Sequence, residues 1–272
     1  MPTIRRILSI ALLAATFVVG LHGQATAQNA PVLDRVLQSG ELRVGMSGNQ
    51  PPFNVMSRGG SLIGIEVDLA TILAAAIGVE LNIVTKPFGE LLPALNAGEV
   101  DIVMSGMAIT AERSREFAFV GPIMFSGKSI LTKSQTLAAV TEAGEINRAN
   151  VRLAALEGST SQQFVEKFLP ETQLTTVSDY DQAVEMLRSD QIDALVADMP
   201  ICLLSLLRYP NEDLATLTQP FTVEPIGIAI PAGDPQFLNL LENYIEALDG
   251  AGLMELLHKK WLEDGSWVAA LP

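Results

Sequence analysis

The chain has 272 residues, which is enough for one large domain or two domains of ordinary size. It carries 31 acidic and 17 basic side chains, a net charge of −14. This balance argues against nucleic acid and anionic membrane surfaces as partners, because both require a positively charged footprint. The one cysteine, Cys202, excludes an intrachain disulfide, and its place in an apolar run predicts a buried structural thiol.

The first 27 residues have the pattern of a secretory signal peptide rather than of a membrane anchor. Arg5 and Arg6 precede an apolar run over 7–19 that is too short to cross a bilayer, and an A-x-A cleavage site ends at Ala27. Cleavage there leaves 15 basic and 31 acidic side chains, a net charge of −16. No cysteine stands at the cleavage site to carry a lipid, so we expect a protein that diffuses freely in the periplasm.

Strands and helices alternate along the first half of the mature chain. Apolar residues recur at i, i+3, i+4 and i+7 from Leu69, which predicts a helix that ends at Gly78. The predicted elements are a strand over 42–46, a helix over 66–77, a strand over 79–86, a helix over 91–97 and a strand over 100–104. This alternation predicts a parallel, doubly wound sheet.

The second half repeats this scheme. Its predicted elements are strands over 151–156, 174–177 and 192–197, with helices over 161–168 and 180–189. Segment 91–106 aligns with segment 183–198 without a gap, which pairs Asp101 with Asp193 and Gly106 with Asp198. A true internal repeat and convergence on a common unit both predict two α/β lobes built alike. A strand over 222–230 and helices over 235–262 should return to the first lobe, with hinge crossings near 131–134 and 223–227.

Arg113 is the candidate ligand-binding residue of the first lobe. The strand over 101–105 ends at a carboxyl edge, where open α/β folds bind ligands, and Thr110 stands where a helix N-cap would stand. A guanidinium beside free N–H groups at a helix start suits a carboxylate held by two hydrogen bonds. The alternative is a surface pair with Glu112, Glu116 or the other lobe.

Three further positions face the predicted crevice. Ser159 and Thr160 open a helix after a Gly, which gives either a second anion site or an ordinary N-cap. Asp198 precedes Met-Pro and another helix, so its carboxylate either caps that helix or accepts an ammonium group. Phe53 and Phe88 follow two strands of the first lobe, where their rings either line the pocket or belong to the core.

No catalytic or metal-binding constellation is evident in the sequence. The mature chain has one histidine, His258, on a late amphipathic helix beside two lysines. It therefore lacks a base for a serine or cysteine nucleophile and a cluster of metal ligands. The Gly59-Gly60 turn starts neither a dinucleotide fingerprint nor a phosphate loop. We expect no catalytic residue, no metal and no cofactor.

With these residues in place, the mature chain resembles the family 3 periplasmic solute-binding proteins, the polar amino-acid receptors of bacterial ABC importers. The segments that carry the resemblance are LRVGMSGNQPPF, GIEVDLATILAAAIGVELNIV, LLPALNAGEVDIVMSGMAITAER, GSTSQQF, IDALVAD and PIGIAIPAGDP. The resemblance implies two Rossmann-like lobes on a two-strand hinge, the type II periplasmic binding protein fold. We therefore expect a signal peptide over 1–27, lobe one over 28–131 and 225–272, and lobe two over 132–224.

The resemblance also implies a function and a role for each candidate residue. A monomer would capture an amino acid or a related small carboxylate by lobe closure and deliver it to an ABC permease in the inner membrane. By position in the family pattern, Arg113 and Thr160 would hold the α-carboxylate of the ligand. Asp198 would hold its α-ammonium beside the Gly106 carbonyl, and Phe53 and Phe88 would pack against the stem of the ligand.

Three positions depart from the family pattern. Ala108 stands where relatives usually carry a hydroxyl, Gln50 replaces an aromatic residue, and Ser47 replaces an acid that relatives binding basic amino acids can carry. Ser47 thus argues against a basic ligand, and Ala108 leaves open a carboxylate with a weak or absent amine. An alternative is an enzyme similar to the cyclohexadienyl or arogenate dehydratases of this fold. Its catalytic carboxylate corresponds here to Gln162, an amide that cannot donate a proton in that way.

Overall fold

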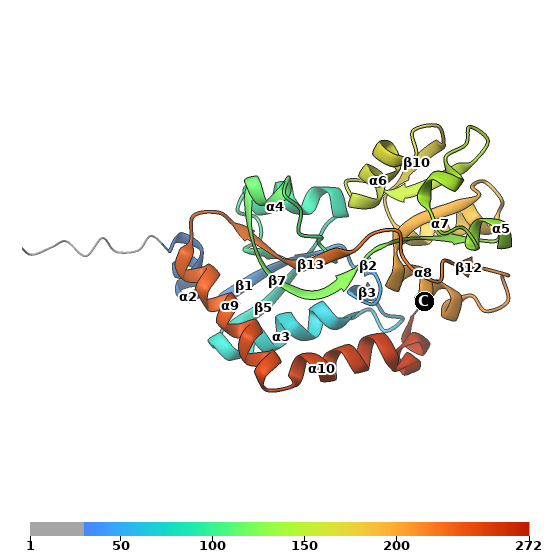
Figure 1. Ribbon diagram of the computed structural model, residues 1–272. Helices are drawn as coiled ribbons and strands as arrows, with labels where there is room; N and C mark the ends of the chain where they lie inside the picture. The colour runs from blue at the N-terminus through green and yellow to red at the C-terminus, as the bar shows by residue number, and fades with distance from the viewer. Residues whose placement is uncertain (1–29, 272) are drawn as a thin grey trace, which may run out of the picture.

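The computed structural model describes residues 30–271 and contains two five-stranded sheets that lie side by side (Figure 1). The predicted signal peptide over 1–27 lies outside the described residues. The first sheet has the order β5 (Glu80–Thr85), β1 (Glu41–Met46), β6 (Ile102–Val103), β13 (Glu224–Pro231) and β7 (Phe117–Ser126). The second has the order β10 (Gln173–Val177), β9 (Arg152–Leu156), β11 (Ala194–Asp198), β8 (Lys128–Thr132) and β12 (Ala215–Thr216). A small third sheet joins β2 (Asn49–Gln50), β3 (Asn54–Met56) and β4 (Leu62–Ile63).

Helices cover both sheets. Those of the first lobe are α2 (Pro31–Ser39), α3 (Ile65–Ile77), η1 (Phe88–Glu90), α4 (Leu91–Asn96), η2 (Arg113–Arg115), α9 (Pro235–Gly250), α10 (Leu253–His258), η4 (Lys259–Glu263) and η5 (Gly265–Ala270). The second lobe has α5 (Gln135–Ala138), η3 (Ala143–Ile146), α6 (Thr160–Phe168), α7 (Tyr180–Arg188) and α8 (Met199–Arg208). Within residues 30–271, no helix combines the length and the apolar character needed to span a membrane.

The two lobes share one arrangement of hydrogen bonds between an aspartate and an arginine, which explains the alignment of 91–106 with 183–198. Asp101 precedes β6 and accepts hydrogen bonds from the backbone N–H of Arg43, at 2.7 Å, and from its guanidinium, at 2.8 Å. Asp193 precedes β11 and accepts the same pair from Arg152, at 2.8 and 2.7 Å. In each lobe the aspartate therefore fixes the register of two parallel strands at their amino ends.

The polypeptide crosses between the sheets at Gly127 and again between β12 and β13. Gly127 separates β7 of the first sheet from β8 of the second, so the first crossing precedes the predicted 131–134, and the predicted lobe boundary at 131 falls inside β8. Strand β8 continues through Leu131 because all five of its residues, 128–132, are buried. A side chain at Gly127 would place its Cβ 1.9 Å from the carbonyl oxygen of Thr222. The two crossings are thus packed directly against each other.

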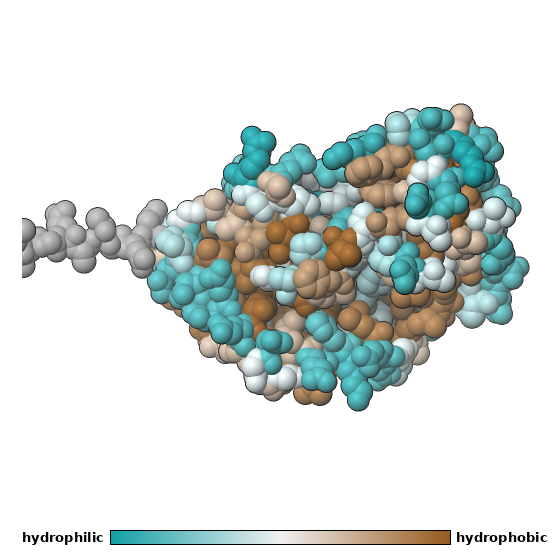
Figure 2. All heavy atoms as spheres, in the orientation of Figure 1, coloured by the Kyte–Doolittle hydropathy of each residue, from teal (hydrophilic) through white to brown (hydrophobic). Residues whose placement is uncertain are grey.

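The predicted α/β class with two similar lobes is confirmed. Strand β1 pairs in parallel with β5 and β6, and β9 pairs in parallel with β10 and β11. The prediction of a parallel sheet holds only for these strands, because β13 pairs antiparallel with β6 and β7, and β8 pairs antiparallel with β11 and β12. The main core cluster runs from the first lobe into one side of the second, while a smaller cluster fills the other side of the second sheet. On the face shown in Figure 2, apolar residues gather over β7 and β13 of the first lobe.

Candidate ligand-binding site

Arg113 lies where the two lobes meet, ten residues after the end of β6. The expected cap is present, since the Thr110 hydroxyl accepts a hydrogen bond from the Arg113 backbone N–H at 3.1 Å. The expected helix is wrong: η2 is a single 3₁₀ turn over Arg113–Arg115. It ends there because Phe117 begins β7, whose pairing with β13 takes over the backbone hydrogen bonds.

The Arg113 guanidinium reaches across to the second lobe. It donates to the carbonyl of Ala108 at 2.9 Å and to the carbonyl of Gly158, in the other lobe, at 3.3 Å. It also lies over the Phe88 ring, 5.9 Å from the centroid. Among residues 30–271 no carboxylate forms an ion pair with it, and burial lowers its pKa, against the attraction of Glu224 and Asp198. Arg113 is thus a partly buried cation without an anionic partner.

Asp198 ends β11 and occupies the N-cap position of α8, but its side chain does not cap that helix. One carboxylate oxygen instead accepts from the Lys128 ammonium at 2.9 Å and from the Ser126 hydroxyl at 3.2 Å. The side chain of Asp198 is 9% exposed. Its carboxylate is therefore part of a buried polar group between the two sheets, and the capping alternative is not realised.

Lys128 and Glu224 complete this group, and both were missed from the sequence. The Lys128 ammonium, whose side chain is 1% exposed, lies 3.0 Å from Glu224 Oε2. The same oxygen accepts from the Thr160 hydroxyl at 2.8 Å, and the other oxygen accepts from Thr222 at 3.2 Å. The available signal was a Lys and a Glu that begin two otherwise uncharged strands.

The charges of the cleft fall into two parts. Lys128, Asp198 and Glu224 form a compact cluster of one cation and two carboxylates. Arg113 of the first lobe, within electrostatic reach of both carboxylates, adds a cation that has no ion-pair partner within residues 30–271. The cluster therefore carries a net charge of −1 opposite a charge of +1, which suits a solute with both signs of charge.

Gly106 lies at the turn after β6, with a φ of +60° that favours glycine. A Cβ there would lie 2.9 Å from the Gln50 amide oxygen and 3.0 Å from the Phe53 ring. Phe53 is completely buried in the core beneath this turn. The Gly106 N–H donates to both oxygens of the buried Glu66 carboxylate, at 2.9 and 3.0 Å.

The remaining predicted residues take backbone or packing roles. The Ser159 hydroxyl donates to the carbonyl of Leu156 at 2.6 Å and accepts from the Gln162 N–H at 3.2 Å, so it caps α6. Ala108 forms a β-bridge with Ile226 and is 2% exposed. Of the eight predicted residues, Arg113, Thr160 and Asp198 place polar atoms on the charged cleft.

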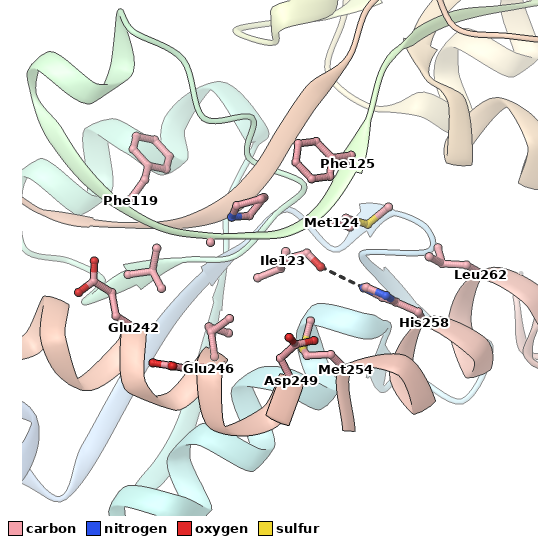
Figure 3. A pocket seen from close by; sticks show the side chains of 14 residues that line it. Phe119, Ile123, Met124, Phe125, Glu242, Glu246, Asp249, Met254, His258 and Leu262 are labelled. Atoms are coloured by element: carbon pink, nitrogen blue, oxygen red, sulfur yellow. Dashed lines mark hydrogen bonds between the residues drawn. The ribbon is translucent and has the colours of Figure 1, made fainter. Parts of the chain in front are cut away.

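The two lobes approach each other closely at Gly89 and Gly158. A Cβ on Gly158, whose φ is +72°, would lie 2.8 Å from the Cα of Gly89. A hollow of about 420 Å³ lies beside this contact and is lined by Phe88, Glu90, Glu157 and Gln162 among others. A hollow of about 640 Å³ lies elsewhere, between β7, α9 and α10, where His258 bonds the carbonyl of Ile123 (Figure 3).

Cys202 is buried as predicted, and burial raises the pKa of its thiol to about 12. The thiol therefore stays protonated at neutral pH. Across residues 30–271, no group of three or more His, Cys, Asp or Glu side chains is arranged to hold a metal ion.

The comparisons with known proteins place this chain in a family. The model of the bacterial extracellular solute-binding proteins, family 3, matches residues 42–264. The chain belongs to this family. Its resemblance to the family, inferred from the sequence, is thereby confirmed.

Three similar proteins illustrate the range of the family. The L-cystine-binding protein TcyJ of Escherichia coli K12 is 26% identical over 250 residues, which cover 92% of each chain. The cyclohexadienyl dehydratase of Pseudomonas aeruginosa is 26% identical over 231 residues, covering 85% of this chain and 86% of the enzyme. The crystal structure of the ancestral amino acid-binding protein AncCDT-1, described as a precursor of cyclohexadienyl dehydratase, is 33% identical with a TM-score of 0.78. It covers 85% of this chain and 99% of its own.

Proposed function

We propose that this protein binds a zwitterionic amino acid between its lobes in the periplasm and delivers it to an ABC permease of the inner membrane. The observation that carries the proposal is the separation of charge across the cleft. Arg113 of the first lobe has no carboxylate partner, and the cluster of Lys128, Asp198 and Glu224 has one carboxylate in excess. An amino acid supplies both missing partners.

In the proposed complex the ligand carboxylate lies on Arg113, and the ligand ammonium lies on the free oxygen of Asp198. A guanidinium can hold a carboxylate by two parallel hydrogen bonds, which fixes its orientation as well as its charge. The two ends of the ligand contact different lobes, so the ligand makes more contacts in the closed state than in the open state. Binding therefore favours the closed state. Ser47, which stands where relatives that bind basic amino acids can carry an acid, argues against a basic side chain on the proposed ligand.

The enzymatic alternative receives less support. Gln162, the position that would carry the dehydratase carboxylate, accepts from the Gly158 N–H at 2.8 Å and donates to Glu166 at 2.8 Å. Both polar atoms of this amide are therefore hydrogen-bonded to residues at or near the start of α6. An amide also does not act as a general acid. We therefore propose a binding protein without catalytic activity.

A thermal-shift panel tests the proposal on protein that has been unfolded and refolded to remove bound solutes. Each L-amino acid is compared with its 2-oxo acid, and prephenate is included. An amino acid at about 100 times its dissociation constant should stabilise the protein by roughly 2.7 kcal/mol, a rise of a few degrees in Tm. Shifts only with oxo acids, or turnover of prephenate, would contradict the proposal.

Asp198→Asn isolates the ammonium contact. Because the amide removes the charge but keeps the shape, we expect calorimetry to show at least tenfold weaker binding of the best amino acid. A weaker oxo-acid ligand should be little affected. Gln191→Ala, an exposed change in the same lobe, is the control. Equal loss for both ligands would mean that Asp198 acts on the fold rather than on the amine.

A further inference from the structure

A buried polar network lies directly beneath the cleft-facing turns of the first lobe. Its centre is the carboxylate of Glu66, in the first turn of α3, which is completely buried. Besides the Gly106 N–H, this carboxylate accepts from the Asn54 amide at 2.9 Å. The Asn54 carbonyl oxygen in turn accepts from the Gly48 N–H at 2.7 Å. The side chains of Glu66 and Asn54 thus connect the turns at Gly48 and Gly106.

These contacts connect Glu66 to the proposed ligand site. Gly48 follows β1 and Gly106 follows β6, so both turns stand at the carboxyl edge of the first sheet. The start of α3 is attached to the same place, because the Glu66 N–H donates to the Phe53 carbonyl at 3.0 Å. The peptide of Gly106 also borders Gln50 and Phe53. A change at Glu66 therefore removes hydrogen bonds that hold the Gly106 turn and Asn54 in place.

We infer that Glu66 is a positioning residue of the ligand site, whose ionised carboxylate holds the Gly106 turn in the conformation that binds the amino acid. This inference rests on the proposed function. Glu66 itself stays below the Gly106 peptide and does not contact the ligand. Its negative charge behind that peptide also favours the proposed ligand ammonium on the other side.

The environment of Glu66 makes its ionisation sensitive to pH. Burial raises its pKa to about 7, and the hydrogen bonds from Gly106 and Asn54 oppose that rise. Both groups that bond the carboxylate are uncharged, and the nearest acid on the same helix, Asp68, bonds Lys260 and Trp261 instead. Binding should select the ionised form, so affinity should fall as the pH drops below the pKa of the free protein.

The test measures dissociation constants by calorimetry from pH 5.5 to 8.5, with L-glutamine or with whichever L-amino acid gives the largest shift in the panel. The wild type should bind with constant affinity above about pH 8 and roughly tenfold more weakly at pH 6. Glu66→Gln should bind more weakly at pH 8 and lose the pH dependence. Glu66→Asp should keep a pH dependence because it keeps the titrating group.

Two control variants address other sources of a pH effect. His258, the only histidine within residues 30–271, lies at the hollow between β7 and α10, so His258→Gln should leave the profile unchanged (Figure 3). Glu246→Gln repeats the chemical change at an exposed position on α9 and should also have no effect.

A third measurement does not depend on a variant that folds. In wild-type protein labelled with ¹³C at glutamate carboxyls, one buried resonance should titrate near pH 7 and move to lower pH on adding the amino acid. A flat affinity profile in the wild type, or an unchanged profile in Glu66→Gln, overturns the inference while the proposed function stands. Absence of binding by every amino acid overturns both.

Discussion

Replacing Lys128 by methionine is expected to lower the free energy of unfolding by about 3–5 kcal/mol, because the change leaves two carboxylates without their cation. Lys128 is 1% exposed, and the side chains of Asp198 and Glu224 are 9% and 17% exposed. Water therefore replaces little of the lost interaction. Urea denaturation at pH 7, with and without the substitution, measures the difference.

Two further variants make this result specific. Lys133→Met removes a lysine whose partner Asp190 is 80% exposed, and it should cost no more than about 1 kcal/mol. The triple variant Lys128→Met, Asp198→Asn, Glu224→Gln removes all three charges and should recover much of the stability. If Lys128→Met lowers the free energy of unfolding no more than Lys133→Met does, the cluster of Lys128, Asp198 and Glu224 does not contribute to stability as predicted.

Arg113→Ala is expected to weaken binding of the amino acid by several kcal/mol, at least a hundredfold in the dissociation constant. The substitution removes the only cation proposed for the ligand carboxylate, which would then be desolvated without a partner. Calorimetry with the best ligand of the panel measures the effect. Folding should be preserved, since Arg113 bonds only two backbone carbonyls at the cleft.

The matched controls separate charge from geometry. Arg113→Lys keeps the charge but loses the planar fork, so its affinity should fall between those of the wild type and Arg113→Ala. Arg115→Ala removes an exposed arginine from the same turn and should leave affinity unchanged. Unchanged affinity in Arg113→Ala would remove this residue from the site and with it the proposed placement of the carboxylate.

Local pattern was sufficient for the α/β class and for the two similar lobes. Strand and helix periodicity depend on which residues alternate or recur along the chain. The repeat at Asp101 and Asp193 reflects the same hydrogen bond in each lobe, from a backbone N–H of the neighbouring strand to the aspartate. The cap at Thr110 was predicted for the same reason, since it spans three residues. The helix predicted after it was wrong, because pairing of β7 with the distant β13 competes with that helix.

The sequence by itself thus determined the family and the alternation of strands and helices in both lobes, and it named Arg113, Thr160 and Asp198 as candidates, because these depend on short motifs. Only the tertiary structure showed that Lys128 and Glu224 meet Asp198, and that Glu66 bonds Gly106, forty residues away. Their pairing follows from which strands and helices adjoin in space. A buried charge is tolerated only where partners meet it, and those partners come from segments that periodicity along the chain does not connect.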